Sequence, residues 1–330
     1  MRIAVDAFGG DNAPIEIIKG AAAAHNEYGV DITLAGDQAK IKAVINDNSL
    51  DFGDTLIIVD SNDVINMHDE PTSILKAHKD CSMAKAFYEL RDGNADAFVS
   101  AGSTGAIVVG GTLIVKRIKG VKRPALASVL PAPNGSYMLM DMGANSDCRP
   151  EMLKQFGIMA SAYMTSVEKR ENPKIALLNI GTEETKGDEL HIEAYKQLSE
   201  APINFIGNIE SREMPKGVCD AVITDGFSGN IALKLIEGTA ITLFKLIKEV
   251  MYKSLPNKLA ALVLKRDLYS LKSMMDSSEV GGAILLGVNK PVIKAHGSSD
   301  AKAIKNAIRQ AMQYAKNDVI GKISESLKAE

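Results

Sequence analysis

The feature that most constrains the fold is the regular alternation of short apolar runs with longer helical patterns. Most of the runs lack the polar–apolar alternation of a strand with one solvated face. They are typical of strands covered on both faces, as in a parallel sheet. We therefore predict strands at residues 3–6, 32–35, 55–60, 97–100, 126–130, 137–141, 175–179, 204–207, 221–224 and 292–295.

Helical patterns fill most of the intervals between these runs. We predict helices at residues 14–27, 82–92, 104–116, 151–169, 188–198, 230–251 and 299–324. This order favours an open α/β sheet with helices on both sides. No sequence repeats at a fixed period and no stretch has the composition of a flexible linker, so we expect one unit over residues 1–330.

One region breaks this rhythm. Residues 230–276 have a helical pattern without a strand, and Pro256 interrupts it. Because proline is poorly tolerated inside a helix, we expect two or more helices that project from the α/β body. Apolar residues after the break alternate with basic ones, which suits either an anionic membrane surface or a dimer interface. The apolar positions are Leu255, Leu259, Leu262, Val263, Leu268, Leu271 and Met275, and the first four are the candidate membrane tip.

Composition excludes several classes of protein. The 330 residues carry a formal net charge of −3, whereas a protein that mainly grips nucleic acid has a basic excess. The three cysteines are widely spaced and odd in number, which favours a reducing cytosol. The first residues lack the apolar core of a secretory signal, and no run reaches the ~18 apolar residues that a membrane span needs. We expect a cytoplasmic protein that meets a membrane only at its surface.

Four glycine-rich turns each follow an apolar run and precede a helix. Glycine lets the backbone approach a ligand closely, and a helix N-terminus attracts an anion. In open α/β sheets, ligands gather at the carboxyl ends of the strands. One such turn has no certain meaning, because it could be only a tight turn, but the four together predict a phosphate site. They span residues 6–14, 100–106, 179–187 and 224–230.

Familiar signatures of other sites are missing. The sequence has no G-x-x-x-x-G-K-[ST] loop, no G-x-G-x-x-G after the first strand and no G-x-S-x-G elbow. The five histidines have no metal-ligand spacing. His68 and His296 are candidates because they lie in predicted loops, whereas His25 lies near a helix end and is expected to be structural. We expect neither a metal nor a cofactor.

Three further side chains could act on a phosphate or a carbonyl. Lys186 lies in a glycine-flanked loop, where it could neutralise a phosphate or simply be solvated. Asn230 could cap the following helix, or its amide could donate to an oxyanion. Asp225 could cap or orient the same turn, and Asn12 could cap the first helix.

Taken in order, six motifs resemble one family. They are VDAFGGDNAP at 5–14, SAGSTGA at 100–106, DMGAN at 141–145, NIGTEE at 179–184, TDGFSGN at 224–230 and AHGSS at 295–299. The set resembles the bacterial phosphate acyltransferases that act on acyl–acyl carrier protein, and the resemblance runs from residue 1 to about residue 308. The chain departs from the family pattern at two positions: Phe8 stands where the family usually has Met, and Ser103 stands where Asn is frequent.

The resemblance implies a fold and a reaction. The fold is a three-layer α/β/α sandwich, Rossmann-like and similar to isocitrate-dehydrogenase-like and phosphotransacetylase proteins, with a protruding helical hairpin. The reaction transfers a long-chain acyl group from acyl–acyl carrier protein to inorganic phosphate, and the acyl phosphate feeds glycerol-3-phosphate acylation in phospholipid synthesis. The resemblance also implies a homodimer at the inner face of the cell membrane. The membrane glycerol-3-phosphate acyltransferase is a further candidate partner.

This reaction asks little of side chains. Phosphate is largely dianionic near neutral pH, and a thiol with a pKa near ~8.5 can leave as a thiolate. What remains is to position the phosphate and to stabilise the oxyanion. We hypothesise that residues 102–105 and 226–230 cradle phosphate near Lys186, and that Asn230 or His296 contacts the thioester oxygen. The candidate binding residues are Asp6, Gly9, Gly10, Gly102, Ser103, Thr104, Gly105, Asn145, Gly181, Thr182, Asp225, Gly226 and Gly229.

A dense basic run is a candidate surface for the acidic carrier protein, because opposite charges steer association. A solvated charged loop explains it equally well. The run comprises Lys116, Arg117, Lys119, Lys122 and Arg123.

Three other functions remain open. A phosphotransacylase that uses acyl-coenzyme A shares the phosphate chemistry and would accept coenzyme A thioesters. A metal-dependent dehydrogenase of similar fold needs a cluster of Asp or His ligands, for which the sequence offers only Asp225 and His296. A non-catalytic membrane scaffold would not turn over, and the number of glycine-rich turns argues against it.

Overall fold

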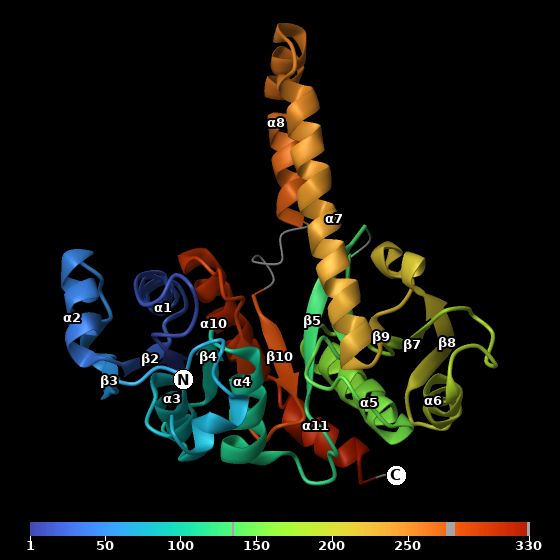
Figure 1. Cartoon of the computed structure of the whole chain (residues 1–330), viewed down its shortest axis with the longest axis horizontal. Coiled ribbons are helices and arrows are strands. Elements are labelled where there is room, and N and C mark those ends of the chain that lie inside the picture. Colours follow the sequence, from blue (N-terminus) through green and yellow to red (C-terminus); the bar gives the residue numbers. More distant parts are fainter. Residues whose placement is uncertain (134, 275–280, 329–330) are drawn as a thin grey trace.

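One mixed sheet with helices on both faces forms the body of the protein (Figure 1). The computed structural model describes residues 1–133, 135–274 and 281–328. In these residues the sheet has 11 strands in the order β3-β2-β1-β4-β11-β10-β5-β6-β9-β7-β8. The strands are β1 (Arg2–Asp6), β2 (Asp31–Gly36), β3 (Ile57–Asp60), β4 (Ala97–Ser100), β5 (Ala125–Ala132), β6 (Gly135–Met140), β7 (Lys174–Asn179), β8 (Asn204–Glu210), β9 (Ala221–Ile223), β10 (Ala283–Leu286) and β11 (Val292–Lys294).

The helices divide between the two faces of the sheet, and each face has its own apolar core. One core includes residues of α1, α5 and α10, and the other includes residues of α3, α4 and the start of α7. The predicted three-layer α/β/α sandwich is therefore confirmed. The helices are α1 (Ile15–Tyr28), α2 (Gln38–Asp47), α3 (Ser82–Arg91), α4 (Thr104–Gly110), α5 (Pro150–Ser166), α6 (Glu189–Ser199), α7 (Gly226–Tyr252), α8 (Leu255–Met274), α10 (Ala301–Lys316) and α11 (Val319–Ser326).

The strands run in two opposite directions. β3, β2, β1, β4 and β11 are mutually parallel, and so are β6, β9, β7 and β8. Three antiparallel pairings separate the two sets: β11 with β10, β10 with β5, and β5 with β6. The prediction of a parallel sheet is wrong at these pairings. A continuous apolar run reports burial on both faces, which a central strand has whatever the direction of its neighbours.

Several predicted elements have different bounds. Strand β10 and helix α2 have no counterpart among the predicted elements. The helix predicted at 104–116 changes after Gly110 to a π-helical segment, Gly111–Lys116. The helix predicted at 299–324 is two helices, because Asp318 adopts a left-handed conformation (φ 40°) and caps α11.

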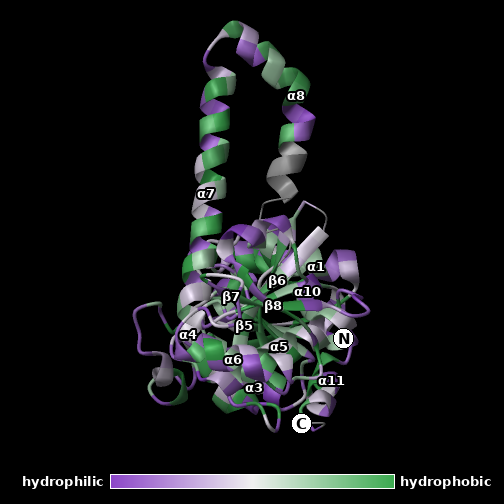
Figure 2. Ribbon diagram, turned by 90° about the vertical axis from the view of Figure 1, so that its right-hand side faces the viewer, coloured by the Kyte–Doolittle hydropathy of each residue, from purple (hydrophilic) through white to green (hydrophobic). Residues whose placement is uncertain are grey.

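Helices α7 and α8 form a hairpin that projects far from the sheet (Figures 1 and 2). The chain reverses at 253–254, where the Ser254 hydroxyl accepts from Asn257 N at 3.3 Å. Pro256 occupies the first turn of α8, a position that tolerates proline. Met275 lies outside the described residues. Apolar residues exposed on the hairpin are Ile231, Leu235, Ile241, Leu243, Leu246, Val250, Tyr252, Leu255, Leu259, Leu262, Val263 and Leu264.

Candidate active site

Three turns of the first parallel set meet at the carboxyl ends of β1, β4 and β11. Asp11 N donates to Gly297 O at 2.8 Å, and the Asn12 amide donates to Ser298 O at 3.0 Å. Asn12 therefore connects the β1 turn to the β11 turn. The prediction that Asn12 caps α1 is wrong. Gly10 has φ 102°, and a Cβ there would lie 2.9 Å from Gly297 O, so only glycine fits. We call the turns after these three strands the first group.

A buried carboxylate organises the first group. Asp6 is 1% exposed at the end of β1 and accepts from the hydroxyls of Ser82 at 2.6 Å and Ser100 at 2.7 Å. Ser100 Oγ in turn accepts from Gly102 N at 2.9 Å. Burial raises the pKa of Asp6, and the two hydroxyl hydrogen bonds oppose that shift. Asp6 thus connects the start of α3 to the turn at residues 102–105.

Lys294 brings a positive charge to the same place. It pairs in register with Ser100 of the neighbouring strand, so both side chains lie on the sheet face that carries Asp6. Lys294 is half-buried, and within the described part of the chain no carboxylate oxygen lies within 4.0 Å of its ammonium. Burial lowers the pKa of the Lys294 ammonium, while the charges of Glu237 and Asp11 oppose that shift. An ammonium without a close partner beside a glycine-rich turn is suited to bind an anion.

The second group of turns follows β6, β9 and β7. Asp141 is fully buried and its carboxylate accepts from four backbone N–H groups at 2.8–3.1 Å, and from the side-chain amide of Asn145 at 2.8 Å. Burial raises the pKa of Asp141, and these hydrogen bonds oppose that shift. The four N–H groups belong to Leu126, Gly143, Ala144 and Asn145.

The start of α7 packs directly on this turn. Asp225 caps the helix by accepting from Phe227 N and Ser228 N, both at 2.9 Å, as predicted. Gly229 packs so closely on the Asp141 carbonyl that a side chain there would clash. Asn230 is not a cap, because α7 already begins at Gly226. The half-buried Asn230 side chain faces Gly143 instead, where a Cβ would lie 3.5 Å from Asn230 Cβ.

The loop that contains Lys186 has an ordered backbone and an exposed lysine. The Asn179 amide donates to Lys186 O at 3.0 Å, and the Asn208 amide donates to Glu183 O at 2.9 Å. Lys186 and Thr182 are exposed. The loop follows β7, so it belongs to the second group.

His296 lies in the first group and is exposed. Its Nδ1 accepts from Ser298 N at 3.2 Å, so the proton of the neutral ring is on Nε2. The outer ring nitrogen is therefore available as a donor. His25 is a structural residue as predicted, because its Nδ1 lies 2.7 Å from Val30 O at the end of α1.

The predicted residues therefore fall into two groups instead of one. The two sets of strands run in opposite directions, so their carboxyl ends do not share one edge of the sheet. Among the described residues no hydrogen bond joins the groups; helix α7 spans them, from Asn230 beside Gly143 to Glu237 near Lys294. The first group holds Asp6, Gly9, Gly10, Gly102, Ser103, Thr104, Gly105 and His296. The second group holds Asn145, Gly181, Thr182, Lys186, Asp225, Gly226, Gly229 and Asn230.

The basic run lies beside the second group. All five of its side chains are exposed on the connection into β5. The Asn145 amide donates to Pro124 O at 2.8 Å, which ties this connection to the Asp141 turn.

The three cysteines, Cys81, Cys148 and Cys219, lie in the interior of the protein. All three are free and buried. Burial raises the pKa of Cys81 to about 11 and that of Cys148 and Cys219 to about 12. These thiols are therefore poor nucleophiles near neutral pH.

The sequence analysis did not single out Ser82, Ser100 or Lys294. Serine is too common to be a signal by itself, and the role of Ser82 depends on a contact 76 positions away in the chain. Lys294 could have been found from the sequence, because a lysine inside the apolar run Val292–Ala295 is unusual in a central strand.

The described residues include no cluster of His, Cys, Asp and Glu side chains that could hold a metal ion. In the same residues, none of the helices combines the length and the apolar character that crossing a membrane requires.

The sheet order and the helices on both of its faces define a three-layer α/β/α fold, which solved phosphotransacetylases share. A phosphotransacetylase from Streptococcus pyogenes superposes with a TM-score of 0.64 over 96% of this chain and 94% of its own, at 18% identity. The family model described as "Fatty acid synthesis protein" matches residues 1–322. The phosphate acyltransferase of Geobacillus thermodenitrificans is 48% identical over 99% of this chain and 99% of its own length. That of Bacillus pumilus is 47% identical over 100% of this chain and 98% of its own length. The chain belongs to the phosphate acyltransferase family, which confirms the resemblance.

Proposed function

We propose that this enzyme transfers a long-chain fatty acyl group from acyl–acyl carrier protein to inorganic phosphate. The acyl phosphate would then serve glycerol-3-phosphate acylation in phospholipid synthesis. The observation that carries the proposal is the relationship to phosphate acyltransferases along the whole chain, at 44–48% identity. The fold adds support, because its neighbours include phosphotransacetylases.

In this proposal the first group binds phosphate. The backbone N–H groups of the turn at 102–105 and the Lys294 ammonium together offer donors and positive charge. A phosphate oxygen attacks the thioester carbonyl carbon, the C–O bond forms, and the C–S bond then breaks to release the carrier thiolate. No base is needed for the dianion, and no acid is needed for the thiolate.

The oxyanion of the tetrahedral intermediate needs a donor between phosphate and carrier. Two side chains are candidates: the amide of Asn230, in the first turns of α7, and Nε2–H of His296, in the first group. Lys186 stays a candidate for an outer contact, since its side chain is exposed in the second group.

We assign the carrier protein to the side of the second group. The exposed basic run adjoins the Asp141 turn there, and the net charge of the whole enzyme is negative, so steering of an acidic carrier needs such a local patch. The acyl thioester of the bound carrier protein would extend along α7 toward the first group.

The hairpin is proposed to serve a homodimer and a membrane surface. Apolar residues on α7, such as Leu235 (67% exposed) and Ile241 (71%), suit a stem that pairs with a second copy. The tip adds Leu262 (68%) and Val263 (81%) among basic residues, which suits the inner face of an anionic membrane. Such an enzyme would be cytoplasmic and peripherally bound, close to the membrane acyltransferase that uses its product.

The test is to mix the purified enzyme with palmitoyl–acyl carrier protein and phosphate, and to trap acyl phosphate with hydroxylamine. Phosphate-dependent product with the carrier thioester, and none with palmitoyl-coenzyme A, supports the proposal. Product with the coenzyme A thioester alone would favour the alternative phosphotransacylase. No product with either donor would contradict both.

A further inference from the structure

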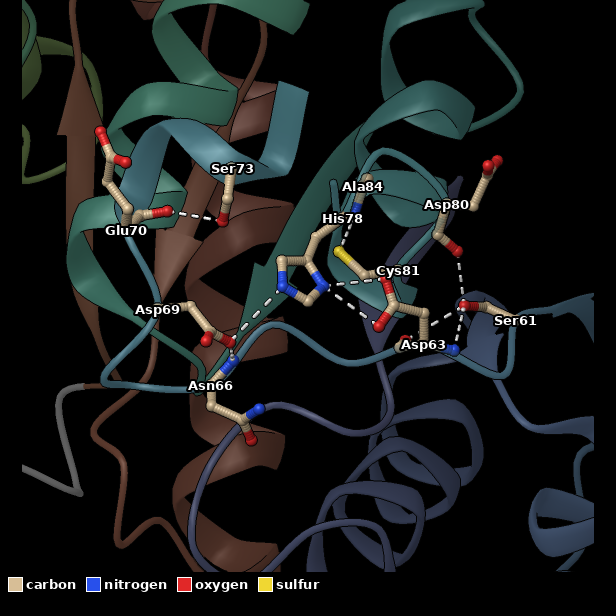
Figure 3. Close-up of polar contacts among 10 residues, drawn as sticks. All are labelled: Ser61, Asp63, Asn66, Asp69, Glu70, Ser73, His78, Asp80, Cys81 and Ala84. Atoms are coloured by element: carbon tan, nitrogen blue, oxygen red, sulfur yellow. Dashed lines mark hydrogen bonds and ion pairs between the residues drawn. The ribbon is translucent and has the colours of Figure 1, made fainter. Parts of the chain in front are cut away.

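In the segment that joins β3 to α3, a histidine lies between two aspartates and contacts both (Figure 3). His78 Nδ1 lies 2.9 and 3.1 Å from the two carboxylate oxygens of Asp63, and its Nε2 lies 3.7 Å from Asp69 Oδ2. All three side chains are half-buried. Because a carboxylate only accepts, Nδ1 carries a proton in this arrangement. We call His78, Asp63 and Asp69 the clasp.

The clasp is continuous with the hydrogen bonds around Asp6. The Asp63 carbonyl accepts from Ser82 N at 3.0 Å, and the Ser82 hydroxyl donates to Asp6 at 2.6 Å. From Asp6 the chain continues through Ser100 to Gly102 N. Every link is a direct contact, so the position of Asp63 bears on the turn proposed to hold phosphate.

A second contact joins the segment to the same turn. Pro71 lies against Gly105, where a Cβ would be only 2.6 Å from Pro71 Cγ. Ser61 fixes the far side of the segment, since its hydroxyl donates to Asp80 O at 2.7 Å. The segment 61–81 is therefore held at both ends and packs on the start of α4.

We propose that His78 is a positioning residue for the phosphate site, which it holds in shape through Asp63, Ser82 and Asp6. This inference rests on the proposed function for the identity of the ligand. His78 itself does not contact phosphate. Its Nδ1–H fixes Asp63, Asp63 fixes the N-terminus of α3, and Ser82 there keeps Asp6 oriented so that Ser100 can order Gly102.

The side-chain chemistry provides a matched set of variants. In His78→Asn the amide nitrogen replaces Nδ1 and keeps the donor to Asp63. In His78→Gln the amide reaches toward Asp69 instead, and His78→Leu removes both ring nitrogens. The control is His25→Leu, because His25 also has a ring nitrogen in a hydrogen bond, here with the Val30 carbonyl, but lies at the end of α1, next to the amino end of β2.

Two measurements follow for each variant: the kcat and phosphate KM in the hydroxylamine assay, and the Kd for inorganic phosphate by calorimetry. We expect His78→Leu to raise phosphate KM and Kd about tenfold, the loss of roughly one charge-assisted hydrogen bond, with KM for the acyl carrier nearly unchanged. His78→Asn should recover most of the affinity and His78→Gln little of it. His25→Leu should stay within about twofold of wild type.

A double-mutant cycle tests the route. If His78 acts through Ser82, His78→Leu should have little further effect on phosphate KM in a Ser82→Ala background. Fully additive effects, or equal phosphate Kd for His78→Leu and wild type, would overturn the positioning role while leaving the proposed function intact. A wild-type enzyme that binds phosphate but forms no acyl phosphate would contradict the proposed function, and the calorimetric series would still decide the role of His78.

Discussion

Two buried aspartates, Asp6 and Asp141, follow strands of the two oppositely directed sets. Each begins a glycine-rich turn, and in the sequence they look alike. Asp141 accepts from three backbone N–H groups and the Asn145 amide of its own turn, and from one N–H of β5. Asp6 is held mainly by the hydroxyls of Ser82 and Ser100, which come from separate elements.

The difference shows that a buried aspartate at a turn can either fix the shape of that turn or link separate segments of the chain. A carboxylate filled by backbone donors fixes a turn in one shape and has little capacity for a ligand. A carboxylate held by serine hydroxyls couples the positions of the segments that carry those serines, because each hydroxyl can also accept a hydrogen bond. We therefore expect Asp141 to matter most for stability and Asp6 most for activity.

The largest effect on folding should come from Asp141→Ala. It leaves four buried N–H groups without an acceptor, and we expect the free energy of unfolding to fall by about 3–5 kcal/mol. Urea denaturation measures this. Asp6→Asn is the comparison and should cost about 1–2 kcal/mol. Equal losses would remove the distinction between the two aspartates.

The largest effect on activity in a folded protein should come from Asp6→Asn. The amide cannot accept at both positions from Ser82 and Ser100, so the turn at 102–105 shifts, and small misplacements cost about 100-fold in rate. The hydroxylamine assay gives kcat/KM. Asp60→Asn is the matched control, since Asp60 also ends a strand but, among the described residues, its carboxylate accepts only from Gln38 N, at 2.9 Å. It should keep near wild-type activity.

Replacing Lys294 separates binding from stability. We expect Lys294→Met to raise phosphate KM at least about tenfold, while the free energy of unfolding stays equal or rises because a half-buried charge is removed. Steady-state kinetics and urea denaturation give the two values. A large loss of stability with unchanged phosphate KM would assign Lys294 a purely structural role.

The pH dependence gives a second check on Lys294. Because burial lowers its pKa in the folded state, the unfolded chain binds more protons between that lowered value and the ordinary one. In that window the wild type should gain stability relative to Lys294→Met as pH rises, while its phosphate affinity falls as the ammonium loses its proton. Parallel profiles for the two proteins would contradict this.

A smaller effect is expected for Lys186→Ala. The side chain is exposed, so screening weakens its attraction to phosphate, and we expect phosphate KM to rise about two- to threefold, less at high salt. A tenfold rise would favour the hypothesis from the sequence, that Lys186 lies next to the phosphate. An unchanged enzyme would remove it from the site.

The smallest effect on turnover in solution should come from the hairpin tip. Changing Leu262 and Val263 to Glu should abolish binding to anionic vesicles in a flotation assay and leave kcat and the dimer unchanged. The control is Ile57→Glu, an exposed apolar residue of the body (43%). Vesicle binding retained by the tip variant, with the dimer intact, would contradict a membrane role.

The cap of α7 illustrates what local sequence predicts well. Of the two roles open to Asp225, capping or orienting its turn, the structure shows capping, with partners two and three residues away. The helix begins at Gly226, earlier than the predicted start at residue 230. Asn12 and Asn230 are capping residue types too, yet neither caps a helix, since one bonds a turn nearly 300 positions away and the other lies inside α7. Local chemistry is predictable where the partner is local.

The sequence by itself determined most strands, most helices, the projecting hairpin and the glycine-rich turns. Burial leaves apolar runs, and positive φ or close packing demands glycine, whatever the rest of the chain does. Only the tertiary structure decided that the turns form two groups, and that Lys294, Ser82 and the clasp lie next to one of them. Strand direction and contacts between distant segments depend on long-range pairing, and an apolar run does not predict which strand it will pair with.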